Sequence, residues 1–136
     1  MGYSAQCDAG CGIGLVGFPG EVIVETATVK AGTYYVSSST LLDLVSGDEG
    51  FCYVTTADTG SIHTEGGSGL GGAYQQASTT DVFSVSAGDA FELVCYNSSG
   101  GSNVFSAAIT ATQINTAFDA KPKPSLRSGS LNLTSK

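Results

Sequence analysis

The chain has 136 residues, of which 41% are hydrophobic and only 12% are charged. This length favours a single domain, and the hydrophobic content excludes a chain that is disordered throughout. A net charge of −7 at pH 7 argues against nucleic acid and acidic membranes as partners, and no apolar run is long enough for a membrane span. Nineteen glycines and only three prolines, with serine and threonine abundant, favour short strands and tight turns, so we expect an all-β domain.

The first twenty residues are rich in glycine and carry Cys7 and Cys11. They run into three successive Gly-x-y triplets over residues 14–22, which are too few to hold a collagen helix. We therefore expect an extended N-terminal arm over residues 1–20, outside the core. The start has neither a positively charged nor a continuous apolar segment, so no signal peptide is expected.

Strand-like segments follow over residues 21–118, the expected body of the domain. They cover residues 22–30, 33–44, 51–56, 90–96 and 103–114. Residues 73–78 and 81–86 form either one bent strand or a pair of strands. A loop over 57–72 carries the only histidine, His63. Alternation assigns three sets of side chains to the core: Tyr34, Val36, Leu42 and Leu44; Phe91, Leu93 and Cys95; and Phe105, Ala107, Ile109 and Ala111. Seven or eight strands at this spacing predict a β-sandwich.

The charge is divided unevenly along the chain. Residues 1–120 hold all twelve carboxylates and one cation, Lys30, whereas the last sixteen residues hold four cations and no carboxylate. We treat residues 119–136 as a basic C-terminal tail. It is too sparse for a nucleic-acid arm, and it is equally compatible with a solvated tail or with one that lies on the acidic body of its own or a neighbouring subunit.

The four cysteines form two dissimilar pairs. Cys52 and Cys95 lie inside apolar strand-like segments, so a cross-strand disulfide is favoured over two buried thiols. Cys7 and Cys11 lie in the glycine-rich segment, where they pair with each other or across chains; a zinc site would need two further ligands that the chain does not supply nearby. Disulfides indicate an extracellular setting, on a secreted protein, a cell surface or a virion. The chain would reach it after losing a leader that Met1 replaces, or by lysis of its cell.

Several stretches resemble the jelly-roll domains of the C1q and tumour necrosis factor superfamily. They are Ala31-Gly32-Thr33-Tyr34-Tyr35-Val36, Gln75-Gln76-Ala77-Ser78, Val82-Phe83-Ser84-Val85-Ser86-Ala87-Gly88-Asp89, Phe91-Glu92-Leu93 and Val104-Phe105-Ser106-Ala107, within residues 22–115. The resemblance implies a jelly-roll β-sandwich of about eight strands, in which the strands that carry Cys52 and Cys95 are hydrogen-bonded neighbours. It also implies a recognition or assembly role rather than catalysis. The chain lacks a collagen stem and the aromatic trimer seam of such domains, so trimerisation is not carried over.

A second resemblance is to small secreted actinobacterial β-proteins of unassigned role. Such proteins carry similar Gly-Thr-Tyr and Phe-Cys-Tyr stretches, which lie here at residues 32–34 and 51–53.

The inventory for catalysis is thin. His63 lies in a glycine-rich loop, and Glu65 nearby offers no rigid support for a triad, so we expect no enzyme. Calcium could use Asp43, Asp48 and Glu49, or Asp58, but the spacing matches no calcium-binding loop, so we expect neither a metal nor a cofactor.

Assembly with other protein subunits is the favoured function. We expect an extracellular structural or adaptor module of a filament, virion or secreted complex, as a homo-oligomer or hetero-complex that joins its neighbours through the terminal arms. Cys7 and Cys11 would lock the first arm, and the arm residues proposed for contact are Phe18, Pro19, Lys121, Lys123 and Arg127. The alternative is a carbohydrate- or receptor-binding module that uses the 57–72 loop, with His63, Glu65 and Tyr74 at the ligand. Tyr53, Tyr74 and Tyr96 are the candidates for stacking on a sugar.

Overall fold

The fold, obtained as a computed structural model, is built from strands alone. The structure describes residues 2–8, 11–57, 65–68, 74–98 and 101–114. None of these residues lies in a helix, so no helix among them could cross a membrane. The strands are β1 (Gly2–Cys7), β2 (Ile13–Gly14), β3 (Glu21–Glu25), β4 (Gly32–Asp43), β5 (Gly50–Thr56), β6 (Glu65–Ser68), β7 (Tyr74–Val85), β8 (Phe91–Asn97) and β9 (Asn103–Ile114).

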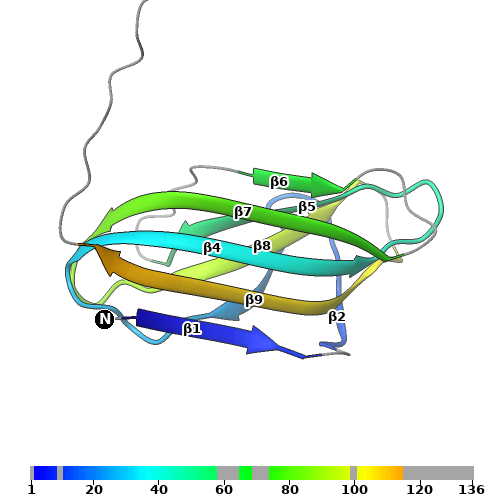
Figure 1. The fold of residues 1–136 in the computed structure, drawn as a ribbon. Helices are drawn as coiled ribbons and strands as arrows, with labels where there is room; N and C mark the ends of the chain where they lie inside the picture. Colours follow the sequence, from blue (N-terminus) through cyan, green and yellow to red (C-terminus); the bar gives the residue numbers. More distant parts are fainter. Residues whose placement is uncertain (1, 9–10, 58–64, 69–73, 99–100, 115–136) are drawn as a thin grey trace, which may run out of the picture.

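Two antiparallel sheets pack face to face (Figure 1). The front sheet has the order β1-β9-β4-β7, with β2 also paired to β9, and the back sheet has the order β3-β8-β5-β6. Consecutive strands repeatedly cross from one sheet to the other, as β3 to β4, β4 to β5 and β8 to β9 do. This arrangement confirms the expected all-β jelly-roll sandwich.

The core lies between the sheets and follows the strand alternation. In β4, Tyr34, Val36 and Leu42 are buried against Phe91 and Leu93 of β8, and none of the five exposes more than 1% of its surface. The same side of β4 also buries two polar residues, Ser38 and Thr40. The core faces predicted for these two strands are therefore confirmed.

One predicted core face was wrong at its first residue. Phe105 was expected to point inward with Ala107, but Val104 is buried and Phe105 is only half-buried. The register between β4 and β9 shifts at this point, because Leu41 pairs with Ser106 whereas Leu42 pairs with Val104. The extra residue is a bulge, and it moves the side chains before it to the opposite face.

The N-terminal segment belongs to the sandwich, which corrects the expectation of an arm outside the core. Strand β1 pairs with β9 over its whole length, from Gly2 opposite Thr112 to Cys7 opposite Ala107. Leu15 is buried in the core. The alternation that allows this pairing is present in residues 2–7, but a six-residue strand forms only where a neighbouring strand accepts its hydrogen bonds.

Two other boundaries differ from the expectation, and one open alternative is decided. Strand β3 ends at Glu25 rather than at residue 30. Of the two alternatives for residues 73–86, one strand or a pair, the structure has the single strand β7, which β4 matches along its full length. The loop expected over 57–72 contains β6, which pairs with β5. Its Glu-Gly-Gly-Ser sequence carries no local strand signal, so only the neighbouring strand makes it a strand.

Candidate binding surface

Aromatic side chains gather on the outward side of the back sheet. Because Cys52 and Cys95 point into the core, alternation turns Phe51, Tyr53 and Tyr96 outward. The register of β5 with β8 pairs Cys52 with Cys95 and therefore Phe51 with Tyr96. Those two rings stack with centroids 5.1 Å apart and an interplanar angle of 22°.

The two disulfides are present within the chain. Cys52 and Cys95 are bonded across the neighbouring strands β5 and β8, as the favoured interpretation held, and neither residue is exposed to solvent. Cys7 and Cys11 are bonded to each other at the end of β1. The first bond holds the two strands that carry the outward aromatic rings in one register.

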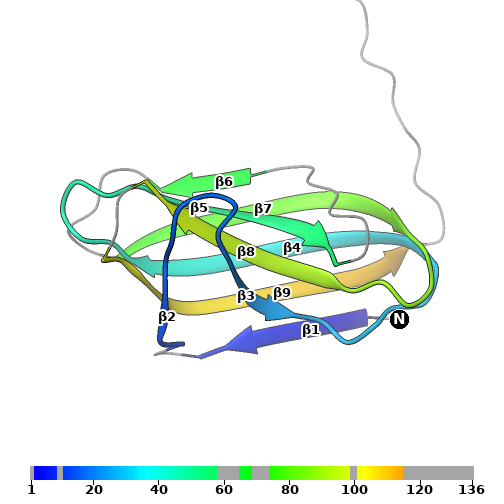
Figure 2. The ribbon, with the colours of Figure 1, turned by 180° about the vertical axis from the view of Figure 1, so that it is seen from behind.

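A fourth ring reaches this face from the connection between β2 and β3. Phe18 lies with its ring centroid 5.1 Å from that of Tyr96 and 6.2 Å from that of Tyr53. The connection passes across β8 on the outside of the back sheet (Figure 2). We call Phe18, Phe51, Tyr53 and Tyr96 the aromatic patch.

The connection that carries Phe18 is held in place by the sheet beneath it. The Tyr53 hydroxyl donates a hydrogen bond to the carbonyl oxygen of Pro19, at 2.8 Å. The backbone N–H of Asn97 donates to the carbonyl oxygen of Val16, at 2.9 Å. Gly20 has a φ of +97°, and a Cβ on it would lie 2.4 Å from the carbonyl oxygen of Cys95, so only glycine fits this close approach.

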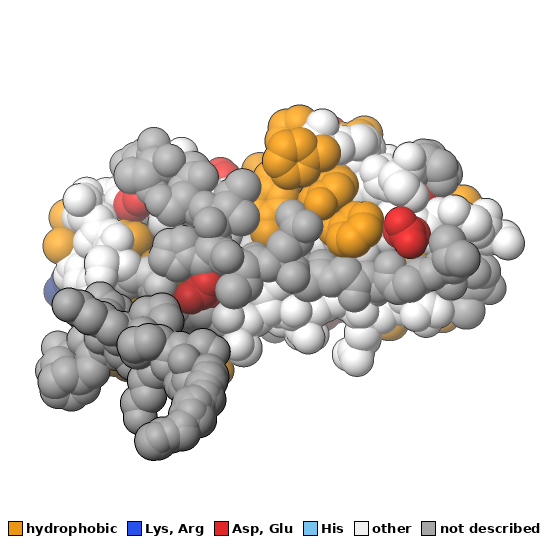
Figure 3. All heavy atoms as spheres, turned by 90° about the horizontal axis from the view of Figure 1, so that it is seen from above, with side chains coloured by type: hydrophobic (Ala, Val, Ile, Leu, Met, Phe, Trp, Pro, Cys, Tyr) orange, Lys and Arg blue, Asp and Glu red, His pale blue; other side chains and the backbone are white. Residues whose placement is uncertain are grey.

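The patch remains open to solvent at its centre. Phe18 exposes 64% of its surface, and the nearby Val16 and Val22 expose 43% and 46%. In Figure 3 hydrophobic side chains gather in the upper middle of the view, on the back-sheet side of the molecule. An exposed phenylalanine on a fixed loop, above a layer of rings, is a surface of the kind that contributes most in protein interfaces.

Asp48 supports one end of the patch from inside. It is fully buried in the turn before β5, where its carboxylate accepts hydrogen bonds from the Asn97 amide, from the hydroxyls of Ser98 and Ser102 and from the backbone N–H of Glu49. The cluster ties the turn before Phe51 to the turn after Tyr96. Sequence analysis considered Asp48 only as a possible calcium ligand, because its partners lie about fifty residues away.

Acidic groups dominate the charge of the described surface. Lys30 is the only cation in the part of the chain that the structure describes, and Glu21, Glu25 and Glu92 lie on the back sheet. Glu25 and Glu92 face each other across β3 and β8. Burial raises the pKa of the Glu92 carboxyl above its ordinary value, and neighbouring Glu25 adds to the shift. Among the described residues, no His, Cys, Asp and Glu side chains gather into a group that could hold a metal ion.

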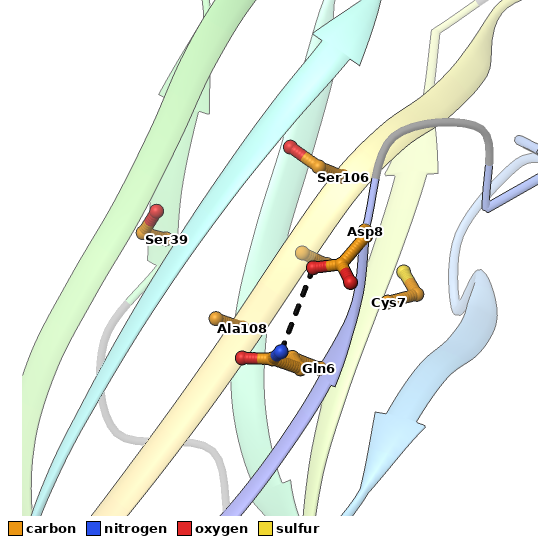
Figure 4. A pocket seen from close by; sticks show the side chains of 7 residues that line it. Gln6, Cys7, Asp8, Ser39, Ser106 and Ala108 are labelled. Atoms are coloured by element: carbon orange, nitrogen blue, oxygen red, sulfur yellow. Dashed lines mark hydrogen bonds between the residues drawn. The ribbon is translucent and has the colours of Figure 1, made fainter.

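A shallow hollow lies on the opposite side, on the front sheet. It has a volume of about 170 Å³ and is lined by small and polar residues of β1, β4 and β9 together with Asp8 (Figure 4). The Gln6 amide donates to the Asp8 carboxylate across it, at 3.5 Å. Its only cysteine, Cys7, is in a disulfide, so the hollow presents no free thiol.

The structure brings together some of the predicted site residues and separates others. Phe18 and Pro19 lie at the aromatic patch, and so do Tyr53 and Tyr96, two of the tyrosines considered for sugar stacking. The third, Tyr74, lies on the outward side of the front sheet, where its ring packs against Phe105 at 5.0 Å. Glu65 begins β6. His63, Lys121, Lys123 and Arg127 lie outside the described residues.

Sequence reasoning missed Phe51, because a residue of a strand shows its outward neighbours only once the register is known. The available signal was the alternation around Cys52, which already set Phe51 and Tyr53 on the face opposite to the cysteine.

Comparisons with solved structures agree with the jelly-roll fold. The chain is similar to the structure of Eiger TNF from S. frugiperda, with a TM-score of 0.57 and 10% identity over 91% of this chain and 100% of that one. It is also similar to murine APRIL at pH 8.0, with a TM-score of 0.54 and 12% identity over 84% of this chain and 100% of that one. The chain is a tumour necrosis factor-like jelly roll.

At these identities the likeness shows the fold of the jelly roll alone. No protein-family model matches the chain, and no curated protein sequence matches it either. The use to which this jelly roll is put must therefore be argued from its own surface.

Proposed function

We propose that this jelly roll is an extracellular protein-binding module and that its aromatic patch is the surface that docks the partner. The observation that carries the proposal is Phe18, which exposes 64% of its surface while its loop is held by the sheet below. Such a ring loses little conformational freedom when a partner covers it, because the loop is already ordered.

The surroundings of the patch suggest the chemistry of the partner. The rings of Phe18, Phe51 and Tyr96 suit an apolar side chain of the partner. Two carboxylates are close to these rings in the sequence, because Glu21 follows Phe18 and Glu49 precedes Phe51. Because Lys30 is the only described cation, the described surface offers carboxylates rather than cations to a partner. A protein segment that combines a large apolar side chain with lysine or arginine fits this surface best.

The extracellular part of the proposal rests on the cysteines. Two disulfides persist only in an oxidising compartment, and the one between Cys52 and Cys95 lies in the core. A secreted, surface-displayed or virion-borne protein meets this condition.

We propose that only part of the terminal segments takes part in assembly with other subunits. Phe18 and Pro19 take part as members or neighbours of the patch, whereas residues 1–20 cannot act as a detached arm because β1 and β2 belong to the front sheet. We propose that the basic residues Lys121, Lys123 and Arg127 add a second contact to an acidic neighbour. Removal of residues 121–136 should then weaken assembly and leave the fold intact.

The first experiment replaces one exposed ring on each face. Phe18→Ser removes the centre of the patch, and Tyr35→Ser is the matched control, since Tyr35 exposes 47% of its surface on the front sheet. A photoreactive phenylalanine analogue at position 18 first identifies the partner in extracellular fluid of the source organism. The purified partner is then titrated calorimetrically against all three proteins.

We expect Phe18→Ser to weaken binding about 30-fold or more, as truncation of a central aromatic residue does in other interfaces. Tyr35→Ser should bind like the unmodified protein. Equal affinity of all three proteins would overturn the proposal. A cross-link to polysaccharide rather than protein would instead favour the carbohydrate-binding alternative, for which the patch offers the half-buried ring of Tyr96, whereas Tyr53 is buried.

A further inference from the structure

Strand β1 has one unoccupied edge. It forms the end of the front sheet and pairs with β9 on one side only, and none of the described strands pairs with its other side (Figure 1). The order of the described strands therefore leaves room for a further strand beside β1. Such an edge is a template for another chain unless the sequence protects it.

The other three sheet edges carry the usual protection. Strand β7 includes Asp81. Strand β3 begins at Glu21, ends at Glu25 and contains a register shift. Strand β6 has only four residues. The six residues of β1 include no charge, no proline and no bulge. Charges, prolines and bulges are the devices by which natural edge strands avoid pairing, so β1 is the one edge left open to it.

The core is also incompletely covered along this edge. Tyr3, Ala5 and Cys7 point toward the core from β1 but remain only half-buried, as does Cys11 beyond the strand. Gly2, Ser4 and Gln6 alternate with them and are exposed. A strand added beyond β1 would cover the remaining apolar surface of this row and continue the sheet.

We infer that the added strand is β1 of a second copy, paired antiparallel about a two-fold axis. The front sheets of two copies then form one continuous sheet. Because side chains alternate with a period of two, the apolar rows meet only where paired residues are both even-numbered or both odd-numbered. The two such registers that overlap most of β1 place Ser4 opposite Ser4 or Ala5 opposite Ala5. Two-fold symmetry is the commonest symmetry of homo-oligomers.

Charge favours a second copy at this edge over the other edges. Pairing β3 or β7 with itself would bring carboxylates toward carboxylates, whereas β1 contributes none. Asp8 follows one end of β1, and the segment that carries Lys30 lies at the other end, where the Lys30 backbone N–H donates to the Tyr3 hydroxyl. Antiparallel pairing brings Asp8 of each copy to the Lys30 end of the other.

The test adds two like charges to one edge strand at a time. Ser4→Lys with Gln6→Lys places lysines on exposed positions of β1, and Ser78→Lys with Thr80→Lys places them on exposed positions of β7 as the matched control. Sedimentation equilibrium on the full chain should show the unmodified protein and the control in equilibrium between 13.7 kDa and twice that mass. The β1 variant should have a dissociation constant at least ten-fold higher, because lysines face lysines across the axis.

Charge reversal makes the test specific to the strand. A variant with glutamate at positions 4 and 6 should also be monomeric, but mixed with the lysine variant it should form heterodimers, since lysine then faces glutamate in either register. Circular dichroism confirms that each variant is folded. A 13.7 kDa monomer for the unmodified protein at every concentration, equal dimerisation of both lysine variants, or no heterodimer in the mixture would each overturn the inference.

This inference goes beyond the proposed function, because the β1 edge and the aromatic patch lie on different sheets. Phe18→Ser should leave the dimer unchanged. Failure of one proposal therefore leaves the other standing.

Discussion

The two sheets share one core but differ in the side chains at the middle of their outward sides. Outward positions at the middle of the front sheet are small and polar, and neighbouring strands align them in rows. Two such rows are Ser4, Thr110, Ser37 and Thr80, and Gln6, Ala108, Ser39 and Ser78. The outward side of the back sheet instead carries the four rings of the aromatic patch.

The difference is informative because folding needs only the inward side of each sheet. Small polar side chains on the outward side of the front sheet can remain in contact with solvent at little cost. On the back sheet the ring of Phe18 exposes 64% of its surface, and this exposure is the observation behind the proposed docking surface. The structure of the back sheet around the patch, from the buried disulfide to Gly20 and Asp48, serves to hold those rings in place.

The largest predicted effect concerns the cross-links of the two sheets. Cys52→Ala with Cys95→Ala opens a link across 43 residues, and Cys7→Ala with Cys11→Ala opens one across 4. Chain-entropy arguments give losses of about 4 and about 2 kcal/mol in the free energy of unfolding. Urea denaturation of both variants measures the difference. A larger loss for the Cys7–Cys11 pair would contradict the view that the back sheet is the more strongly constrained.

Removal of the buried carboxylate should follow in size. Asp48→Ala removes the acceptor of four hydrogen bonds and should lower the free energy of unfolding by about 3 kcal/mol. Asp43→Ala, at an exposed position on the end of β4, should change it by less than about 0.5 kcal/mol. Denaturant melts of the two variants make the comparison, and equal losses would show that the cluster does not hold this end of the molecule together.

Substitution of two glycines distinguishes a steric clash beneath the aromatic patch from the cost of a positive φ. Gly20 and Gly47 both have a φ near +90°, but an added Cβ would collide with Cys95 only at Gly20 and would meet nothing within 4 Å at Gly47. Gly20→Ala should be about 2 kcal/mol less stable than Gly47→Ala, because only the first is overpacked. It should also move Phe18 and weaken partner binding, which Gly47→Ala should not do. Thermal melts and the calorimetric titration check both parts.

The smallest effect depends on pH. The raised pKa of Glu92 means that the folded state holds this proton more tightly than the unfolded chain does. The resulting cost to stability is absent below the ordinary glutamate pKa of about 4.3 and grows as the pH rises through the raised value. Glu92→Gln should therefore increase the melting temperature at pH 7 and leave it unchanged near pH 3. Glu25→Gln should give part of the same gain, and the two gains should not add, since the carboxylates are neighbours.

The structure agrees with the expectations that rest on local sequence patterns and differs from them where strands far apart in the chain must pair. The strands over residues 33–44, 51–56, 90–96 and 103–114 were predicted within about a residue, because each alternates along its own length. Strand β6 could not be predicted, since Glu-Gly-Gly-Ser has no preference for a strand until β5 pairs with it. Phe105 was placed inward because a bulge opposite Leu41 leaves no trace in the local pattern.

The residues of the candidate binding surface were also predicted only in part. Phe18 and Pro19 were singled out as contact residues, although as part of a free arm, and Tyr53 and Tyr96 were considered as stacking residues. Their meeting with Phe51 depends on the register of β5 with β8 and on the path of the β2–β3 connection. Neither can be read from residues that are close together in the chain.

The sequence by itself determined the all-β class, the core faces of β4 and β8 and the pair of cysteines that can meet inside a sandwich. These follow from composition and from alternation, which every strand carries locally. Only the tertiary structure decided that residues 2–7 become an edge strand, that Asp48 is buried among distant donors and that four aromatic residues share one face. Each depends on hydrogen bonds or packing between segments far apart in the chain, and such pairing is settled by the whole fold.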